Sequence, residues 1–65
     1  MSDIKNFNDV QKLLLQFGTL IYTRDKEADI DMMEDELKEL REQGLIEVET
    51  YMSALMILKK RRSER

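Results

Sequence analysis

The residues best suited to chemistry lie in one short segment, Tyr22-Thr23-Arg24-Asp25-Lys26. An aromatic ring can stack on an unpaired base, and cations together with the free N–H groups of a helix N-terminus can hold phosphates. The candidate contacts for a single-stranded nucleic acid (RNA or DNA) are therefore Tyr22, Thr23, Arg24 and Lys26. The alternative is structural, with Thr23 or Asp25 capping a helix and the remaining side chains in solvent.

A second group of cations follows the last apolar segment of the chain. Consecutive cations can neutralise successive phosphates and release counterions, which favours binding to nucleic acid. Such residues are also ordinary at a helix C-terminus, where they offset the negative end of the helix dipole. The candidate phosphate contacts, with a solvated helix end as the alternative, are Lys59, Lys60, Arg61 and Arg62.

Charge is distributed unevenly along the chain. Residues 1–26, 27–49 and 50–65 carry net charges of +1, −8 and +4, within an overall charge of −3. The overall charge disfavours nucleic acid, but phosphate binding follows the local potential, which decays over about 8 Å at physiological salt. The basic segments therefore leave a nucleic-acid ligand possible.

The sequence contains few residues suited to catalysis or to metal binding. The chain has no Cys and no His, so thiolate nucleophiles, imidazole bases and the usual zinc ligands are missing. Asp31 and Asp35 lie one helical turn apart, but they lack the loop glycine and oxygen spacing of an EF-hand, and we interpret them as a solvated acidic face. We expect a protein that is not an enzyme and has no metal or cofactor.

The elements that must position the candidate residues are helices. The 65 residues include no Pro, and Gly18 and Gly44 divide them into three segments of helical length, each with apolar residues at spacings of three and four. The sequence predicts an all-α fold, a compact three-helix bundle forming one domain over residues 1–65, with helices at 8–17, 25–43 and 48–62. Residues 1–5 and 63–65 are expected to be loose ends.

The apolar residues are distributed differently in the second and third predicted helices. In the second they form a narrow stripe from which Met32 is excluded: Ile30, Met33, Leu37 and Leu40. In the third they spread over about 260° of the helix surface, more than a two-faced helix needs. This helix is either the central packing element or exposes apolar surface to a partner. The alternative function is therefore a protein-interaction adaptor, or a homodimer formed through this helix.

The N-terminus shows no targeting signal. It lacks a basic region followed by a long apolar segment, and no apolar run approaches the ~20 residues needed to span a bilayer. We therefore expect a cytoplasmic protein that does not enter membranes.

Three separated motifs occur in order: Phe7-x-Asp9-Val10-Gln11-x-Leu13-Leu14, Gly18-Thr19-x-Ile21-Tyr22-Thr23 and Ala28-Asp29-Ile30-x-x-Met33-Glu34-Asp35-Glu36-Leu37. Over residues 7–58 the chain resembles the YqgQ-like family of small Firmicutes proteins. The resemblance implies a cytoplasmic three-helix bundle that binds single-stranded nucleic acid. The family's Tyr-Thr-Gly-Asp-Arg segment falls on residues 22–26, where Arg24 replaces Gly and Lys26 replaces Arg. The first change adds a cation where a close backbone approach is lost, and the second gives up planar stacking and bidentate phosphate contact.

Overall fold

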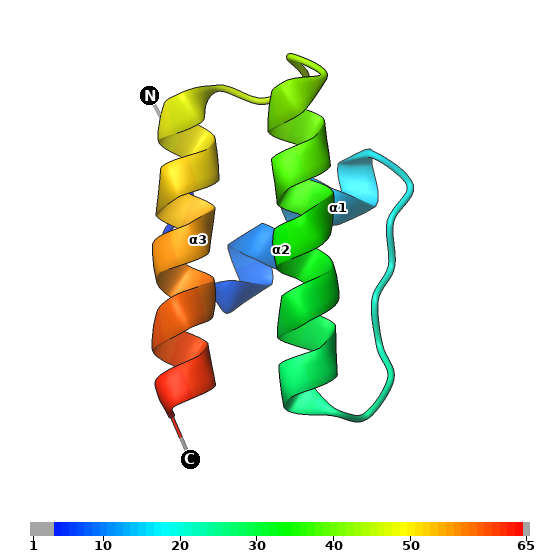
Figure 1. Ribbon diagram of the computed structural model, residues 1–65, viewed down its shortest axis with the longest axis vertical. Coiled ribbons are helices and arrows are strands. Elements are labelled where there is room, and N and C mark those ends of the chain that lie inside the picture. The colour runs from blue at the N-terminus through cyan, green and yellow to red at the C-terminus, as the bar shows by residue number, and fades with distance from the viewer. Residues whose placement is uncertain (1–3, 65) are drawn as a thin grey trace.

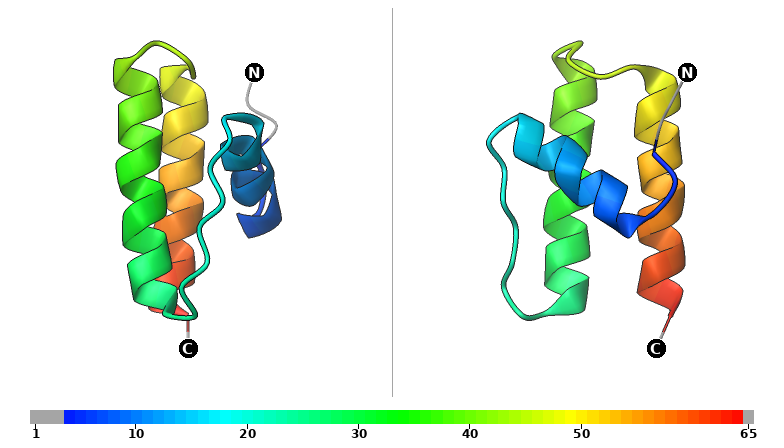
Figure 2. Two further views of the ribbon diagram at one scale, coloured as in Figure 1. Left: turned by 90° about the vertical axis from the view of Figure 1, so that its right-hand side faces the viewer. Right: turned by 180° about the vertical axis from the view of Figure 1, so that it is seen from behind.

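A computed structural model describes residues 4–64 of the chain, and these residues form helices and no strand. The helices are α1 (Phe7–Gln16), α2 (Lys26–Glu42) and α3 (Val48–Ser63). α2 and α3 lie side by side and antiparallel, and α1 crosses one face of this pair (Figures 1 and 2). The predicted all-α three-helix bundle is confirmed, and each helix begins and ends within one residue of its expected bounds.

Glycine ends the first two helices as expected. Gly18 and Gly44 follow α1 and α2 with φ of 80° and 75°, a region that glycine enters without a Cβ clash. After Gly44, the Leu45 amide donates to the Leu40 carbonyl at 2.9 Å. This hydrogen bond belongs to a Schellman motif, which satisfies the last carbonyls of a helix. The chain therefore turns sharply into the connection to α3.

The ends of the described chain are held by hydrogen bonds. The Lys5 amide donates to Asp9 Oδ2 at 3.0 Å, and Ser63 Oγ, in the last residue of α3, donates to the Lys59 carbonyl at 2.9 Å. The expectation of loose ends is therefore wrong at Lys5 and Ser63, because local hydrogen bonds extend the order beyond the apolar pattern. The same prediction for residues 1–3 and 65 lies outside the described residues.

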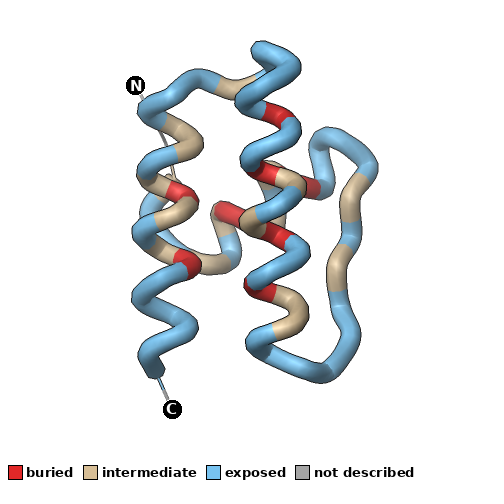
Figure 3. The backbone as a smooth tube through the Cα atoms, viewed as in Figure 1, coloured by how far each residue is buried: buried red, intermediate tan, exposed pale blue. Residues whose placement is uncertain are grey.

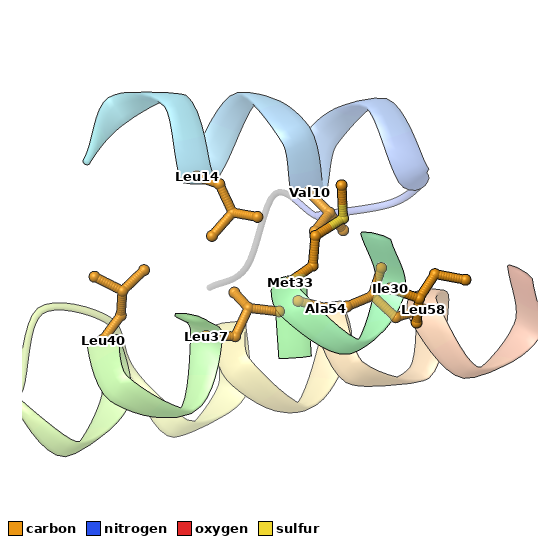
Figure 4. Packing of buried hydrophobic residues seen from close by; sticks show 8 residues of the cluster. All are labelled: Val10, Leu14, Ile30, Met33, Leu37, Leu40, Ala54 and Leu58. Carbon is orange, nitrogen blue, oxygen red and sulfur yellow. The ribbon is translucent and has the colours of Figure 1, made fainter. Parts of the chain in front are cut away.

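The core lies where the three helices face one another (Figure 3). The whole stripe predicted for α2 is buried, and α3 contributes only two of the residues that are less than 9% exposed. Figure 4 shows these side chains converging between the helices. The buried residues are Val10, Leu14, Ile30, Met33, Leu37, Leu40, Ala54 and Leu58.

The third helix leaves much of its apolar surface uncovered. α3 packs on both α1 and α2, yet Val48, Met52 and Met56 are 57%, 53% and 69% exposed. The structure therefore bears out both alternatives for this helix: α3 is the central packing element, and it also exposes apolar surface. Met32 on α2 is also exposed, as expected, at 48%. Within residues 4–64, no helix has both the length and the apolar character needed to cross a bilayer.

Candidate nucleic-acid interface

The loop that carries Tyr22 is fastened to α2. Residues 17–25 leave α1 and run along α2 to its N-terminus (Figures 1 and 2). The amide and Oγ1 of Thr23 both donate to Asp29 Oδ1, at 2.8 and 2.6 Å. Hydrogen bonds to a carboxylate are stronger than those between neutral groups. Thr23 therefore positions the loop, while the Tyr22 side chain remains in solvent, with the residue 74% exposed.

The N-terminus of α2 is capped by Asp25. Its Oδ1 accepts hydrogen bonds from the Glu27 and Ala28 amides at 3.1 and 3.3 Å. These are among the amides that we expected to be free for a phosphate. A phosphate bound there would meet the Asp25 charge at short range, and like charges repel. The expectation of free N–H groups at this helix end is therefore wrong, and anion binding near the loop depends on side chains.

Arg24 occupies an unusual backbone conformation. Its φ is 70°, and it is the one residue other than glycine with positive φ among residues 4–64. This conformation costs a residue with a Cβ about 1–2 kcal/mol. The resemblance implies glycine at this position, which would enter the conformation without that cost. The chain thus keeps the turn and adds a guanidinium group at its tip.

A groove of about 420 Å³ lies beside this loop. Tyr22, Arg24 and Lys26 line it from the loop and the start of α2, and Arg61 lines it from α3. Part of its floor is apolar, formed by Ile30 and Met33 among others. We call it the tyrosine groove. It brings together parts of the two segments that the sequence offered as separate candidates.

A second hollow, of about 550 Å³, adjoins the tyrosine groove. Lys5 and Lys60 line it, and it shares Phe7, Gln11 and Arg61 with the groove. We call it the lysine hollow. The Arg61 guanidinium carbon lies 3.9 Å from the centroid of the Phe7 ring, a cation–π contact that fixes both side chains. Phe7 and Arg61 thus form a wall common to the two depressions.

The four consecutive cations of α3 point in different directions. Arg61 lies over Phe7, and Lys60 lines the lysine hollow. Arg62 instead pairs with Asp31 and, at 3.3 Å, with Glu34 on α2. Successive helical residues are turned by about 100°, so a run of four cannot face one ligand. The set therefore does not form one phosphate-binding strip.

The structure gathers five of the eight residues that the sequence proposed as contacts, and three lie elsewhere. Thr23 is bonded to Asp29 and does not line the groove, and Arg62 is paired with α2. Lys59 is exposed and lines neither depression. The residues that line the groove or the hollow are Tyr22, Arg24, Lys26, Lys60 and Arg61.

Sequence reasoning missed two residues of this surface. Phe7 belongs to the apolar pattern of α1, which gave no reason to separate it from the core, and Lys5 lay in an expected loose end. Both line the lysine hollow because the start of α1 lies beside α3, where the Arg61 side chain covers the Phe7 ring. No local pattern signals this approach, since residues so far apart in sequence meet only through the packing of the helices.

The groove is locally basic within an acidic protein. Arg24, Lys26 and Arg61 line it against one carboxylate, that of Asp29, which already accepts two hydrogen bonds from Thr23. The Lys26 ammonium group donates to the Glu64 carbonyl, which draws the end of α3 towards the start of α2. Because the cations outnumber the carboxylate, the groove favours an anion.

The acidic face of α2 has a structural use. Asp31 and Glu34 hold Arg62 of α3. Within residues 4–64 the acidic side chains form no group of three placed to bind a metal ion. This face therefore joins α2 to α3.

The chain belongs to the YqgQ-like family, whose model matches residues 4–64. It is similar to the uncharacterized protein YqgQ of Bacillus subtilis (strain 168), with 44% identity over 57 residues, which cover 88% of this chain and 80% of that protein. No solved structure matches the chain. The family resemblance drawn from the three sequence motifs is thus confirmed.

Proposed function

We propose that this protein is a non-enzymatic cytoplasmic module that binds single-stranded nucleic acid across the tyrosine groove and the lysine hollow. The observation that carries the proposal is the 74% exposed Tyr22 at a groove lined by Arg24, Lys26 and Arg61. An exposed ring beside several cations suits a ligand that offers both a flat base and a phosphate. A duplex suits it less, because its bases are stacked on one another.

The dimensions of the site support a short ligand segment. The groove volume of about 420 Å³ lies within the range of small-molecule sites, roughly 300–1,000 Å³. One base stacked on Tyr22 would place its flanking phosphates near Arg24 and Lys26. The strand would then continue past Arg61 into the lysine hollow, where Lys5 and Lys60 are available.

The test is fluorescence anisotropy of labelled single-stranded RNA, single-stranded DNA and a duplex titrated with the protein. We expect saturable binding to the single strands and weaker binding to the duplex. Tyr22→Ala should weaken single-strand binding by about 1–3 kcal/mol, the usual contribution of one stacked base. Leu20→Ala is the matched control, because Leu20 is 76% exposed in the same loop but lies outside the groove.

Two adjacent arginines test the basic part of the site. Arg61→Gln should weaken binding because Arg61 lines both depressions. Arg62→Gln should have little effect because Arg62 is paired with Asp31 and Glu34. Equal losses in the two variants would show that only the general charge of the α3 end matters. No single-strand binding at low salt would refute the proposed function.

A further inference from the structure

We propose that the exposed apolar surface of α3 binds a second copy of this chain, forming a symmetric dimer in which two α3 helices pack antiparallel. The surface consists of Val48, Met52 and Met56, and we call it the methionine face. Its residues are 57%, 53% and 69% exposed and are spaced four apart, so they follow one side of the helix. The methionine face lines neither the tyrosine groove nor the lysine hollow, although Lys60, near its edge, lines the hollow.

The methionine face differs from scattered surface residues. Single exposed apolar side chains are ordinary in soluble proteins. Here Met52 and Met56 lie on the side of α3 turned away from Ala54 and Leu58, which are buried, and Val48 continues the exposed row towards the start of the helix. Methionine is also flexible and polarizable, which suits a surface that packs on a copy of itself.

The distribution of charge along α3 favours a second copy of the chain as the partner and an antiparallel orientation of the two α3 helices. Glu49 lies in the first turn, whereas Lys59 and Lys60 lie in the last turns. Within residues 4–64, neither lysine forms an ion pair with a carboxylate. An antiparallel arrangement brings the acidic start of each helix beside the basic end of the other. A parallel arrangement would place like charges together and align the helix dipoles unfavourably.

The same arrangement matches the apolar residues. A two-fold axis passing midway between Met52 and Met56 places Met52 of one copy against Met56 of the other, twice. Such a contact is self-complementary and closes at two subunits, as symmetric dimers require. One register thus pairs Met52 with Met56 and brings Glu49 to the level of Lys59, while Val48 lies at the level of Lys60, whose methylene groups can pack on it.

The size of the face sets the strength of the association. A standard interface buries about 800 Å² on each partner, which is about a sixth of the 4836 Å² surface of this chain. One helix face offers less than this. We therefore expect a dimer that forms between micromolar and millimolar protein concentration.

Sedimentation equilibrium of the full chain over this concentration range tests the proposal. The expected result is a rise in average mass from 7.8 kDa towards twice that value. Met56→Glu should weaken dimerisation by at least about ten-fold, the loss expected of a central interface residue. Met32→Glu is the matched control, because Met32 is 48% exposed on α2 and away from this face, and it should dimerise like the wild type.

Charge exchange tests the antiparallel direction. Glu49→Lys and Lys59→Glu should each weaken the dimer several-fold, and the double variant should recover much of the loss. Circular dichroism of each variant shows whether the helices remain folded. A wild type that stays monomeric up to millimolar concentration overturns the proposal and leaves a different protein as the partner of this face. A dimer unaffected by Met56→Glu overturns it as well, because the contact would then lie elsewhere.

Discussion

At the scale of single residues, Arg24 combines a backbone cost with a cation that lines the tyrosine groove. Its φ of 70° would suit glycine, so Arg24→Gly should raise the free energy of unfolding by about 0.5–1 kcal/mol, the strain relieved less the added flexibility of the unfolded chain. Urea unfolding measures this change. Arg24→Ala keeps the strain and should show no such gain. An Arg24→Gly protein that is less stable than the wild type would contradict this account of the turn.

Thr23 acts on the same site from outside the groove. Thr23→Val removes the 2.6 Å hydrogen bond to Asp29 and leaves a more mobile Tyr22 loop. We expect a loss of about 1 kcal/mol in stability and weaker binding of single strands. Thr23→Ser keeps the hydroxyl group and serves as the control in both the unfolding and the anisotropy measurements. Unchanged binding of single strands by Thr23→Val would mean that binding does not depend on the hydrogen bond between Thr23 and Asp29.

At the scale of elements, the signals that end the helices and form the core were local and could be predicted. Gly18 and Gly44 mark the ends of α1 and α2, because only a residue without a Cβ enters positive φ freely. The stripe of α2 follows directly from a spacing of three and four residues. Each of these patterns lies within one short stretch of sequence. The helices of the structure therefore begin and end within one residue of the predicted bounds.

The candidate site was less predictable because it depends on how the elements meet. The sequence treats Arg61 and Arg62 alike, but α1 crosses beside one and α2 lies beside the other. Their different environments depend on how α3 is rotated about its axis relative to α1 and α2. No local sequence pattern specifies that rotation. The sequence offers Asp25 as a cap of α2, but it does not show that the Asp25 side chain occupies the amides of Glu27 and Ala28, which a phosphate would need.

Gly44 provides a test at this scale. Apart from the glycine itself and its two chain neighbours, no atom lies within 4 Å of the place that a Cβ would occupy, so any effect of substitution comes from the local backbone. Gly44→Ala should cost about 1 kcal/mol and lower the melting temperature by roughly 4–8 °C in a domain of this size. Gly44→Asn should cost less, because asparagine tolerates this conformation better. Thermal unfolding followed by circular dichroism makes the comparison, and an unchanged melting temperature for Gly44→Ala would argue against the Schellman turn.

At the scale of the whole molecule, the separation of charge decides how the proposed ligand is bound. The protein carries −3 overall, but residues 50–65 carry +4 and residues 27–49 carry −8. A polyanion is repelled by the molecule as a whole and attracted to one part of it. Binding should therefore involve few phosphates, those within reach of the cations that line the groove and the hollow.

The salt dependence of binding measures that number. Each phosphate neutralised on a single strand contributes about −0.7 to the slope of log K against log salt concentration. Arg24, Lys26 and Arg61 alone predict a slope of about −2, and the addition of Lys5 and Lys60 about −3.5. Arg61→Gln should make the slope shallower by about 0.7, whereas Arg62→Gln should leave it unchanged. A slope near zero for the wild type would show that stacking alone holds the strand, since the cations of the groove would then neutralise no phosphate.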